Sequence, residues 1–178
     1  AGLIGRGLIE HWAKIPVEVD IASEFRYRSP LIDEKTLVIV ISQSGETADT
    51  LAALRESKKK GARVVAITNV VGSSVAREAH DVIHTWAGPE IAVASTKAYT
   101  TQIEAMVLLA LYLTQAKQTM SQEWITEIIS ELRKIPDKAE EILKQAGRIQ
   151  ELSKYFEQVD NTFFIGRGLD WAVAQEGS

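Results

Sequence analysis

Two short runs of apolar, mostly β-branched side chains constrain this chain most strongly. Residues 37–41 read Leu-Val-Ile-Val-Ile, and residues 63–67 read Arg-Val-Val-Ala-Ile. Continuous runs of this kind are typical of parallel strands that are covered on both faces. Each run leads into polar turn residues and then into a helical pattern. This alternation predicts an α/β fold, with a three-layer, doubly wound parallel sheet and helices on both of its faces.

Apolar spacing predicts the remaining elements. Side chains that recur every three to four residues indicate helices, and the alternation of Val17, Val19 and Ile21 with acidic residues indicates a half-buried strand. The predicted helices cover residues 1–14, 23–27, 47–60, 73–78, 95–117, 121–134, 136–145 and 148–158. Besides the two apolar runs, the predicted strands cover residues 17–21, 81–85 and 162–165.

The segment Ser42-Gln43-Ser44-Gly45-Glu46-Thr47 joins the first apolar run to a predicted helix. The first backbone amides of a helix have no intrahelical acceptor, and the helix dipole adds partial positive charge at that end. Three hydroxyl groups and the Gln43 amide add further donors, and Gly45 allows the backbone to approach a ligand closely. These features together predict a binding site for a phosphate ester. The segment has neither the lysine of a nucleotide P-loop nor the glycine pattern of a dinucleotide site.

A simpler interpretation of the same segment stays open at this point. Its serines could act as a plain N-cap, with Glu46 satisfying the first helical turn. Three hydroxyl groups are more than capping requires, whereas at Ser73 and Ser74 capping is the favoured interpretation. Lys97 either opens the long helix that follows or contacts a ligand. The histidines lack partners at metal-ligand spacing and are interpreted as structural or surface residues; they are His11, His80 and His84.

Composition narrows the functional class. The 178 residues carry a net charge of −4, so no basic field attracts nucleic acid, and no nucleic-acid partner is expected. The absence of cysteine excludes disulfides, thiolate metal sites and a cysteine nucleophile, and it agrees with a reducing compartment. The longest apolar run, residues 106–113, is shorter than the about 20 residues that a transmembrane helix needs. We therefore expect a cytoplasmic protein with no membrane segment, metal or other cofactor.

Three stretches of the sequence resemble a known family. Besides the segment at 42–47, they are residues 21–28, which read IASEFRYR, and residues 88–100, which read GPEIAVASTKAYT. The segment at 42–47 alone resembles any SIS (sugar isomerase) domain. The three together are similar to the isomerase half of the glutamine–fructose-6-phosphate aminotransferases, and the resemblance runs over almost the whole chain. It implies a flavodoxin-like fold built from two SIS copies.

The resemblance also implies a ligand and its contacts. Members of that family take ammonia from glutamine and convert fructose 6-phosphate to glucosamine 6-phosphate, so either sugar phosphate is an expected partner. The residues implied to hold its phosphate are Ser42, Gln43, Ser44 and Thr47. Val93, through its backbone, and Ser95 are implied to contact the sugar. The family dimerises through this half, so a homodimer is expected, and residues 108–113 could supply part of its surface.

Departures from the family pattern imply a fragment. The glutaminase half begins with a catalytic cysteine, which this chain lacks, and the first SIS strand should precede Ala1. The acid–base groups should follow the motif that Gln175-Glu176-Gly177 matches. We therefore expect a fragment that contains none of the catalytic residues. Because isomerisation requires a positioned acid and base, such a fragment should be inactive alone even though its parent is an enzyme.

The expected domain organisation follows from the same comparison. Residues 1–120 should form the first SIS domain without its first strand, and residues 121–160 a helical cover or connector. Residues 161–178 should supply either the first strand and turn of a second SIS copy or a strand that completes the sheet. The pentapeptide Ile-Gly-Arg-Gly-Leu, found at 4–8 and again at 165–169, agrees with a second copy.

Two other functions remain possible from the sequence. SIS domains also sense sugar phosphates, without catalysis, beside the DNA-binding modules of transcriptional regulators. Related SIS enzymes include phosphosugar isomerases and fructosamine-phosphate deglycases. Those enzymes should share the segment at 42–47 but lack the match over residues 90–100.

Overall fold

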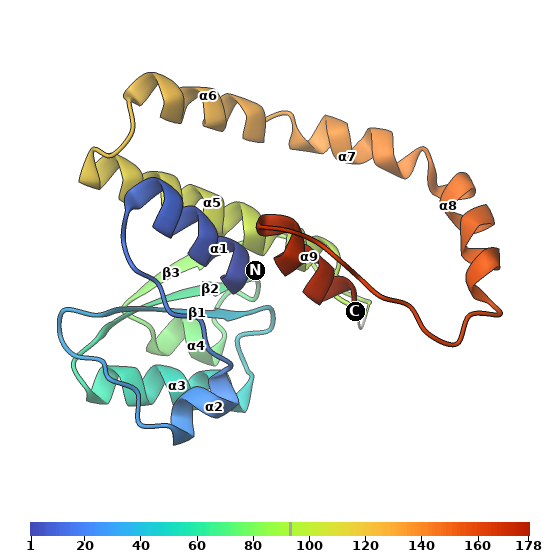
Figure 1. Ribbon diagram of the computed structural model, residues 1–178. Coiled ribbons are helices and arrows are strands. Elements are labelled where there is room, and N and C mark those ends of the chain that lie inside the picture. Colours follow the sequence, from blue (N-terminus) through green and yellow to red (C-terminus); the bar gives the residue numbers. More distant parts are fainter. Residues whose placement is uncertain (93) are drawn as a thin grey trace.

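A computed structural model describes residues 1–92 and 94–178 and shows three layers (Figure 1). The middle layer is a three-stranded parallel sheet with the order β1-β2-β3 among the described residues. Its strands are β1 (Leu37–Ser42), β2 (Arg63–Thr68) and β3 (Asp81–His84). Because the strands are parallel and Ser42 pairs with Thr68, which pairs with His84, their carboxyl ends share one edge. The predicted α/β fold with a parallel sheet is confirmed.

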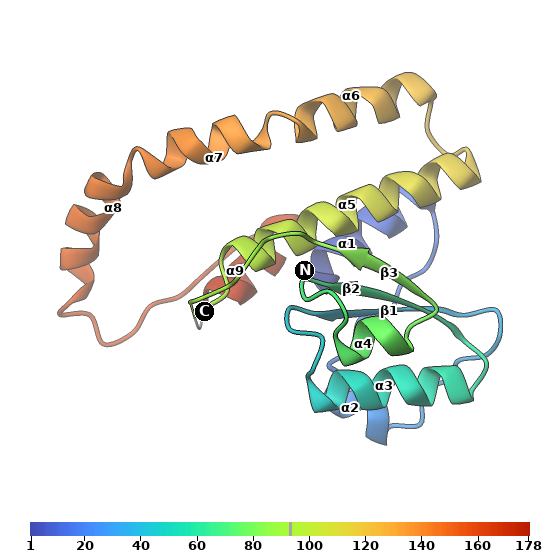
Figure 2. The same ribbon diagram turned by 180° about the vertical axis from the view of Figure 1, so that it is seen from behind.

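Helices cover both faces of the sheet, which explains why β1 is apolar from Leu37 to Ile41 and β2 from Val64 to Ile67. On one face lie α3 (Ala48–Lys59) and α4 (Ser74–Glu78), with the short α2 (Ala22–Tyr27) against α3. On the other face lie α1 (Gly2–Leu8), the π-helix η1 (Ile9–Ala13) and α5 (Lys97–Lys117), as Figure 2 shows from behind. No described helix combines the length and the apolar character that crossing a bilayer demands.

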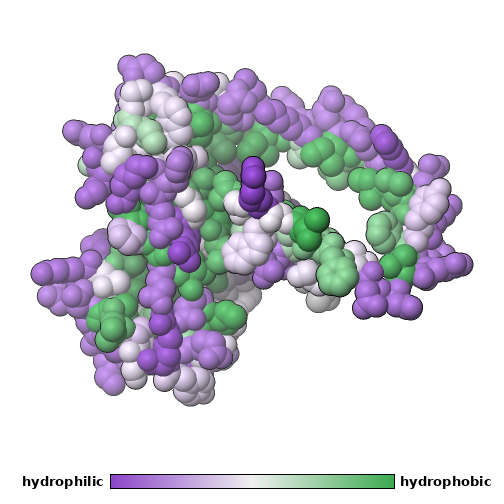
Figure 3. All heavy atoms as spheres, in the orientation of Figure 1, coloured by the Kyte–Doolittle hydropathy of each residue, from purple (hydrophilic) through white to green (hydrophobic). Residues whose placement is uncertain are grey.

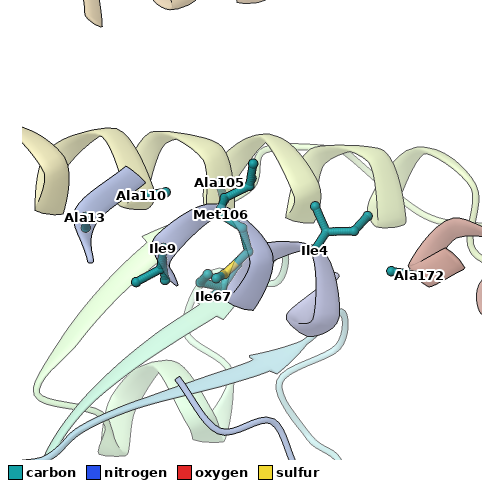
Figure 4. Packing of buried hydrophobic residues seen from close by; sticks show 9 residues of the cluster. Ile4, Ile9, Ala13, Ile67, Ala105, Met106, Ala110 and Ala172 are labelled. Carbon is teal, nitrogen blue, oxygen red and sulfur yellow. The ribbon is translucent and has the colours of Figure 1, made fainter. Parts of the chain in front are cut away.

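Two clusters of buried side chains hold these layers together. Between the sheet and the layer of α1 and α5, Ile9, Ile67 and Met106 converge (Figure 4). On the opposite face, Leu54 of α3 is fully buried against β2 and belongs to the cluster that includes Val64. Since neighbouring residues of a strand point to opposite faces, β2 contributes to both clusters. The central strand therefore ties the two layers of helices together.

Beyond α5, the chain forms an arm that arches away from the layer of α1 and α5 and returns to it (Figures 1 and 2). Its elements are α6 (Gln122–Leu132), α7 (Ile135–Leu143), α8 (Ala146–Ser153) and the 3-10 helix η2 (Lys154–Phe156). An edge-to-face contact between Trp12 and Trp124, with ring centroids 5.2 Å apart, docks α6. In Figure 3, apolar side chains line the inner side of the arm. The last helix, α9 (Leu169–Gly177), lies beside α1.

Two predicted strands are wrong. Residues 17–21 are extended but pair with no described strand, because the Val17 amide donates to Glu10 Oε1 at 3.1 Å instead of to a strand partner. Val17 is half-buried against the core, so its apolar alternation reflects packing rather than pairing. Residues 162–165 also lie outside the sheet, and Phe163 and Ile165 are 87% and 91% exposed.

The repeated pentapeptide has no structural counterpart. Residues 4–8 lie in α1, whereas residues 165–169 form a turn that enters α9. By contrast, the capping role predicted for Ser73 is confirmed, because its Oγ accepts a hydrogen bond from the Ala76 amide. The structural role predicted for the histidines is confirmed at His80, whose Nδ1 accepts from the Val64 amide at 2.9 Å.

Candidate functional site

The segment Ser42–Thr47 connects the carboxyl end of β1 to the first residue of α3, as its sequence predicts. Ser42 ends β1 and is buried, and Thr47 is the extended N-cap residue of α3, with φ −64° and ψ 120°. In open parallel sheets, ligands bind beyond the carboxyl ends of the strands. The segment therefore lies where a ligand site is expected in this architecture, and it is called the hydroxyl loop below.

Hydrogen bonds among its own residues hold the hydroxyl loop in shape. Ser42 Oγ accepts from the Gly45 amide at 3.0 Å and lies 3.1 Å from Thr47 Oγ1, and Ser44 Oγ accepts from the Glu46 amide at 3.2 Å. A hydroxyl group has one donor hydrogen and two acceptor lone pairs. Ser44 therefore keeps its donor, and one donor remains in the pair formed by Ser42 and Thr47. Two hydroxyl hydrogens are left for a ligand.

The backbone at the start of α3 supplies further donors. The first α3 amide to reach a carbonyl of the preceding turn is that of Leu51, which donates to Thr47 O at 3.0 Å. Among the described residues, none accepts a hydrogen bond from the amides of Ala48, Asp49 or Thr50. These free amides lie at the positive end of a twelve-residue helix. Together with the hydroxyl hydrogens they can bind an anion.

Gly45 is required by the backbone of the hydroxyl loop. Its φ is +67°, and a Cβ at this position would lie 2.1 Å from Ser73 Oγ and 2.8 Å from Thr68 Oγ1. Its carbonyl accepts from the Val75 amide at 2.9 Å. The sequence predicts that Gly45 allows close approach to a ligand. In the structure, the close approach is to Ser73 at the start of α4, which seats the loop against the sheet.

The acidic groups next to this loop are engaged elsewhere. Glu46 Oε1 accepts from the Ser74 amide at 2.7 Å, and hydrogen bonds from Ser74 hold the pKa of the Glu46 carboxyl below its ordinary value. Asp49, in the first turn of α3, pairs with the Arg26 guanidinium of α2 at 2.8 Å. The opposite charge of Arg26 offsets the Asp49 carboxylate, so an incoming anion meets less repulsion than the sequence alone indicates.

A cavity of about 440 Å³ opens beside the hydroxyl loop at the same edge of the sheet. Its wall joins three carboxyl-terminal loops, those that follow β1, β2 and β3. The residues that line it are Gln43, Asn69, Val70, Val71, Trp86, Gly88, Pro89 and Glu90. Gln43 is therefore the member of the hydroxyl loop that faces this cavity, and a ligand bound to the loop would extend from Gln43 towards residues 86–90.

The other residues that the sequence predicts to contact a ligand are not among the described residues that line this cavity. Val93 falls outside the described residues. Ser95 is half-buried just before α5 and is not among the described residues that line the cavity. Lys97 is exposed and begins α5, in agreement with a role in helix entry. Glu90, on the cavity wall, accepts a hydrogen bond from the Ala98 amide at 3.1 Å. It therefore caps α5 although it precedes that helix by several residues.

Sequence reasoning missed several residues of this site. Among the polar turn residues that follow the second apolar run, sequence analysis does not single out Asn69, and it singles out neither Arg26 nor Trp86. The position of Asn69 directly after β2 was a usable signal, because parallel strands bring their carboxyl ends together. Nothing in the spacing of Arg26 and Asp49 indicates that they pair. Within the described residues, no group of three His, Asp or Glu side chains could hold a metal ion.

Comparison with known proteins places the fold in a family. The family model of the SIS domain matches residues 1–112. The chain belongs to the SIS domain family. The match spans the whole sheet, the hydroxyl loop and most of α5, so the candidate site described above is part of the SIS domain itself.

Relatives of this SIS domain extend the comparison to the whole chain. It is 63% identical over 178 residues to a glutamine–fructose-6-phosphate aminotransferase (isomerizing) of Clostridium tetani and 62% identical to one of Caldanaerobacter subterraneus. All of this chain is covered, but it spans only 29% of the length of each relative.

Solved structures agree with this comparison. The C-terminal domain of the glucosamine-fructose-6-phosphate aminotransferase from Francisella tularensis matches with a TM-score of 0.95 and 42% identity, over 99% of this chain and 50% of that one. A glucosamine-6-phosphate deaminase from Thermotoga maritima, 24% identical with a TM-score of 0.61 over 72% of this chain and 39% of that one, shares the fold. The SIS fold predicted from the sequence is confirmed.

Proposed function

We propose that this SIS domain binds the phosphate of a sugar phosphate in its hydroxyl loop, as part of the isomerase region of a glutamine–fructose-6-phosphate aminotransferase. The observation that carries the proposal is the set of free donors at the carboxyl end of β1: two hydroxyl hydrogens and the first amides of α3. The names of the aminotransferase relatives, which match the whole chain, supply the substrate, fructose 6-phosphate. They also favour this function over a sensor or another SIS enzyme.

Each residue of the loop has a distinct role in this proposal. Ser44 and one hydroxyl of the pair Ser42 and Thr47 donate to phosphate oxygens, and the α3 amides complete the cradle. Gln43, which lines the cavity, reaches the part of the ligand that leaves the loop. Ser95 and Val93 are proposed to contact the sugar further out, as the resemblance implies.

The proposed contribution to the reaction is anchoring and orientation. Isomerisation of a ketose phosphate moves a proton between neighbouring carbons, which requires a positioned acid and base. Glu90, the carboxylate on the cavity wall, accepts from the α5 amide of Ala98. We therefore assign no acid–base role to Glu90, and the resemblance implies none for the other residues of this chain. Holding the phosphate fixes the position of the sugar, and such positioning lowers the barrier for groups supplied by the rest of the enzyme.

The test is a paired titration by calorimetry or NMR. Glucosamine 6-phosphate is expected to bind and to shift the amide signals of Ser44 and Thr47, whereas glucosamine is not. Ser44→Ala should weaken binding roughly 10- to 100-fold, because a hydrogen bond to a charged group is lost. Ser153→Ala, on the exposed α8, is the matched control and should change nothing. Equal binding of the two sugars would contradict a phosphate site.

We also propose that the aminotransferase region works as a cytoplasmic homodimer. Its phosphorylated substrate is charged and does not cross a bilayer unaided. On α5, Leu108 and Tyr112 are 49% and 67% exposed, which leaves apolar surface available for a second copy. Sedimentation equilibrium should show dimers that Tyr112→Ser weakens, whereas Ile142→Ser on the arm is the control. A strict monomer at high concentration would rule this interface out.

A further inference from the structure

Asn69 is hydrogen-bonded to both of the loops that flank it at the carboxyl edge of the sheet. Its backbone amide donates to Gln43 O in the hydroxyl loop at 3.1 Å. Its side chain donates from Nδ2 to Gly88 O at 2.7 Å. Its Oδ1 accepts from the Ala87 amide at 2.8 Å and from Thr85 Oγ1 at 3.2 Å. One residue thus connects the loops that follow β1 and β3.

The segment that the Asn69 side chain holds has an unusual backbone. Trp86 and Gly88 both lie in the left-handed region, with φ values of 54° and 70°. A left-handed tryptophan is strained and persists only where the surroundings fix it. Trp86 is itself 76% exposed, so burial of its ring does little to fix it. The three side-chain bonds of Asn69 fall on Gly88 itself, on Ala87 between the two positions and on Thr85 before them, and they hold the segment in this conformation.

The same segment is anchored at its other end and forms one side of the cavity. Glu90 Oε2 accepts from the Ala98 amide, which ties the end of the segment to the start of α5. Trp86 and Pro89 of this segment line the cavity, as Gln43 of the hydroxyl loop does. Asn69 contacts Gln43 through its backbone and this wall through its side chain. Asn69 therefore links the two loops that contribute Gln43 and residues 86–90 to the cavity lining.

We propose that Asn69 is a positioning residue of the sugar-phosphate site, and this inference rests on the proposed function. Through its backbone it contacts the loop that binds the phosphate, and through its side chain it holds the wall against which the sugar lies. Removing the side chain frees the wall at residues 85–88 but leaves the hydrogen bond to Gln43 and the hydroxyl loop intact. Sugar recognition and phosphate recognition should therefore respond differently to the same substitution.

The test compares two ligands on the 178-residue chain. Asn69→Ala should leave the dissociation constant for inorganic phosphate within about 2-fold of the original value. It should raise the dissociation constant for glucosamine 6-phosphate by roughly 10-fold, because the wall that contacts the sugar is no longer held in place. Asn161→Ala, in an exposed stretch outside the sheet, is the matched control and should alter neither constant. Thermal unfolding of both variants checks that each is folded.

The outcomes separate this inference from the proposed function. If the unsubstituted chain binds neither ligand at the hydroxyl loop, the proposed function fails, and this inference fails with it. If the chain binds both ligands but Asn69→Ala weakens them equally, or weakens neither, Asn69 has no positioning role. If Asn69→Ala does not fold, Gly88→Ala replaces it, because a side chain at φ 70° strains the same wall while a Cβ there meets open space. The same split between the two ligands is then expected, and an equal effect overturns the inference.

Discussion

Gly45→Ala is expected to abolish sugar-phosphate binding and to destabilise the chain at the same time. An alanine in the left-handed region costs about 1–2 kcal/mol. Its Cβ would also lie 2.1 Å from Ser73 Oγ and 2.6 Å from Ser73 Cβ, and overpacking of this kind adds about 1–3 kcal/mol. We therefore expect the free energy of unfolding to fall by about 2–5 kcal/mol, as measured by urea denaturation. Ser73 is almost completely buried and caps α4, so it cannot move easily. The hydroxyl loop must therefore change its conformation.

Gly72→Ala separates the strain of a left-handed backbone from the steric clash with Ser73. Gly72 has φ +73°, close to that of Gly45, but a Cβ there would meet no atom within 4 Å. The free energy of unfolding should fall by only about 1–2 kcal/mol, and ligand binding should persist. If Gly45→Ala costs no more than Gly72→Ala and still binds glucosamine 6-phosphate, the seating of the loop against Ser73 is not what shapes the site.

Ile67→Ala is expected to cause the largest loss of stability among simple core truncations. Ile67 is fully buried in the central strand and packs with Ile9 and Met106 between the sheet and the layer of α1 and α5 (Figure 4). Truncation of a buried isoleucine leaves a cavity and costs about 2–5 kcal/mol. For a chain of this size, that loss lowers the midpoint of thermal unfolding by roughly 5–15 °C. Differential scanning calorimetry would measure it.

The matched control is Ile165→Ala, which removes the same atoms from a side chain that is 91% exposed. Its effect on the free energy of unfolding should stay within about 0.5 kcal/mol. Similar losses at both positions would mean that residue 165 is covered in solution, for instance by a second copy of the chain. No measurable loss at Ile67 would contradict the packing of the central strand described above.

The parts of the fold that could be predicted are those in which local pattern and final environment agree. β1 and β2 are apolar on both faces because helices cover both faces, so their runs indicate buried strands directly. The hydroxyl loop could be located because its residues serve the junction between a strand and a helix. The helix ends at Ser73 and Ser121 were predictable for the same reason, since each serine accepts a hydrogen bond from its own first turn.

The errors arise where a pattern depends on partners distant in the sequence. Alternation at residues 17–21 predicts half-burial, which is found at Val17 and Val19 but not at Ile21. A strand also needs a neighbour, and Glu10 accepts from the Val17 amide instead. Residues 162–165 have strong strand propensity and no described neighbour. Propensity describes how well side chains fit a pleated surface and cannot supply that surface.

The same limit applies to the candidate site. The sequence locates the hydroxyl loop, but it does not show that Arg26 pairs with Asp49 or that Asn69 bridges two loops, because both contacts join residues far apart along the chain. Spacing along one element cannot reveal contacts between elements. The identity of a residue that follows a parallel strand is the better guide, since all such residues meet at one edge.

The contact between α1 and α9 brings together two helices that lie far apart in the sequence. Ala172 is buried in the same cluster as Ile4, and Leu169 lies against Gly7, so opposite ends of the polypeptide share one core. The exposed arm connects α5 to α9, and α9 already packs against the layer of α1 and α5. The arm is called the strap below. A protease nick in the strap, between α8 and α9, would therefore leave the two pieces associated through that core. Pulling α9 away would expose Ile4 and loosen the layer above the sheet.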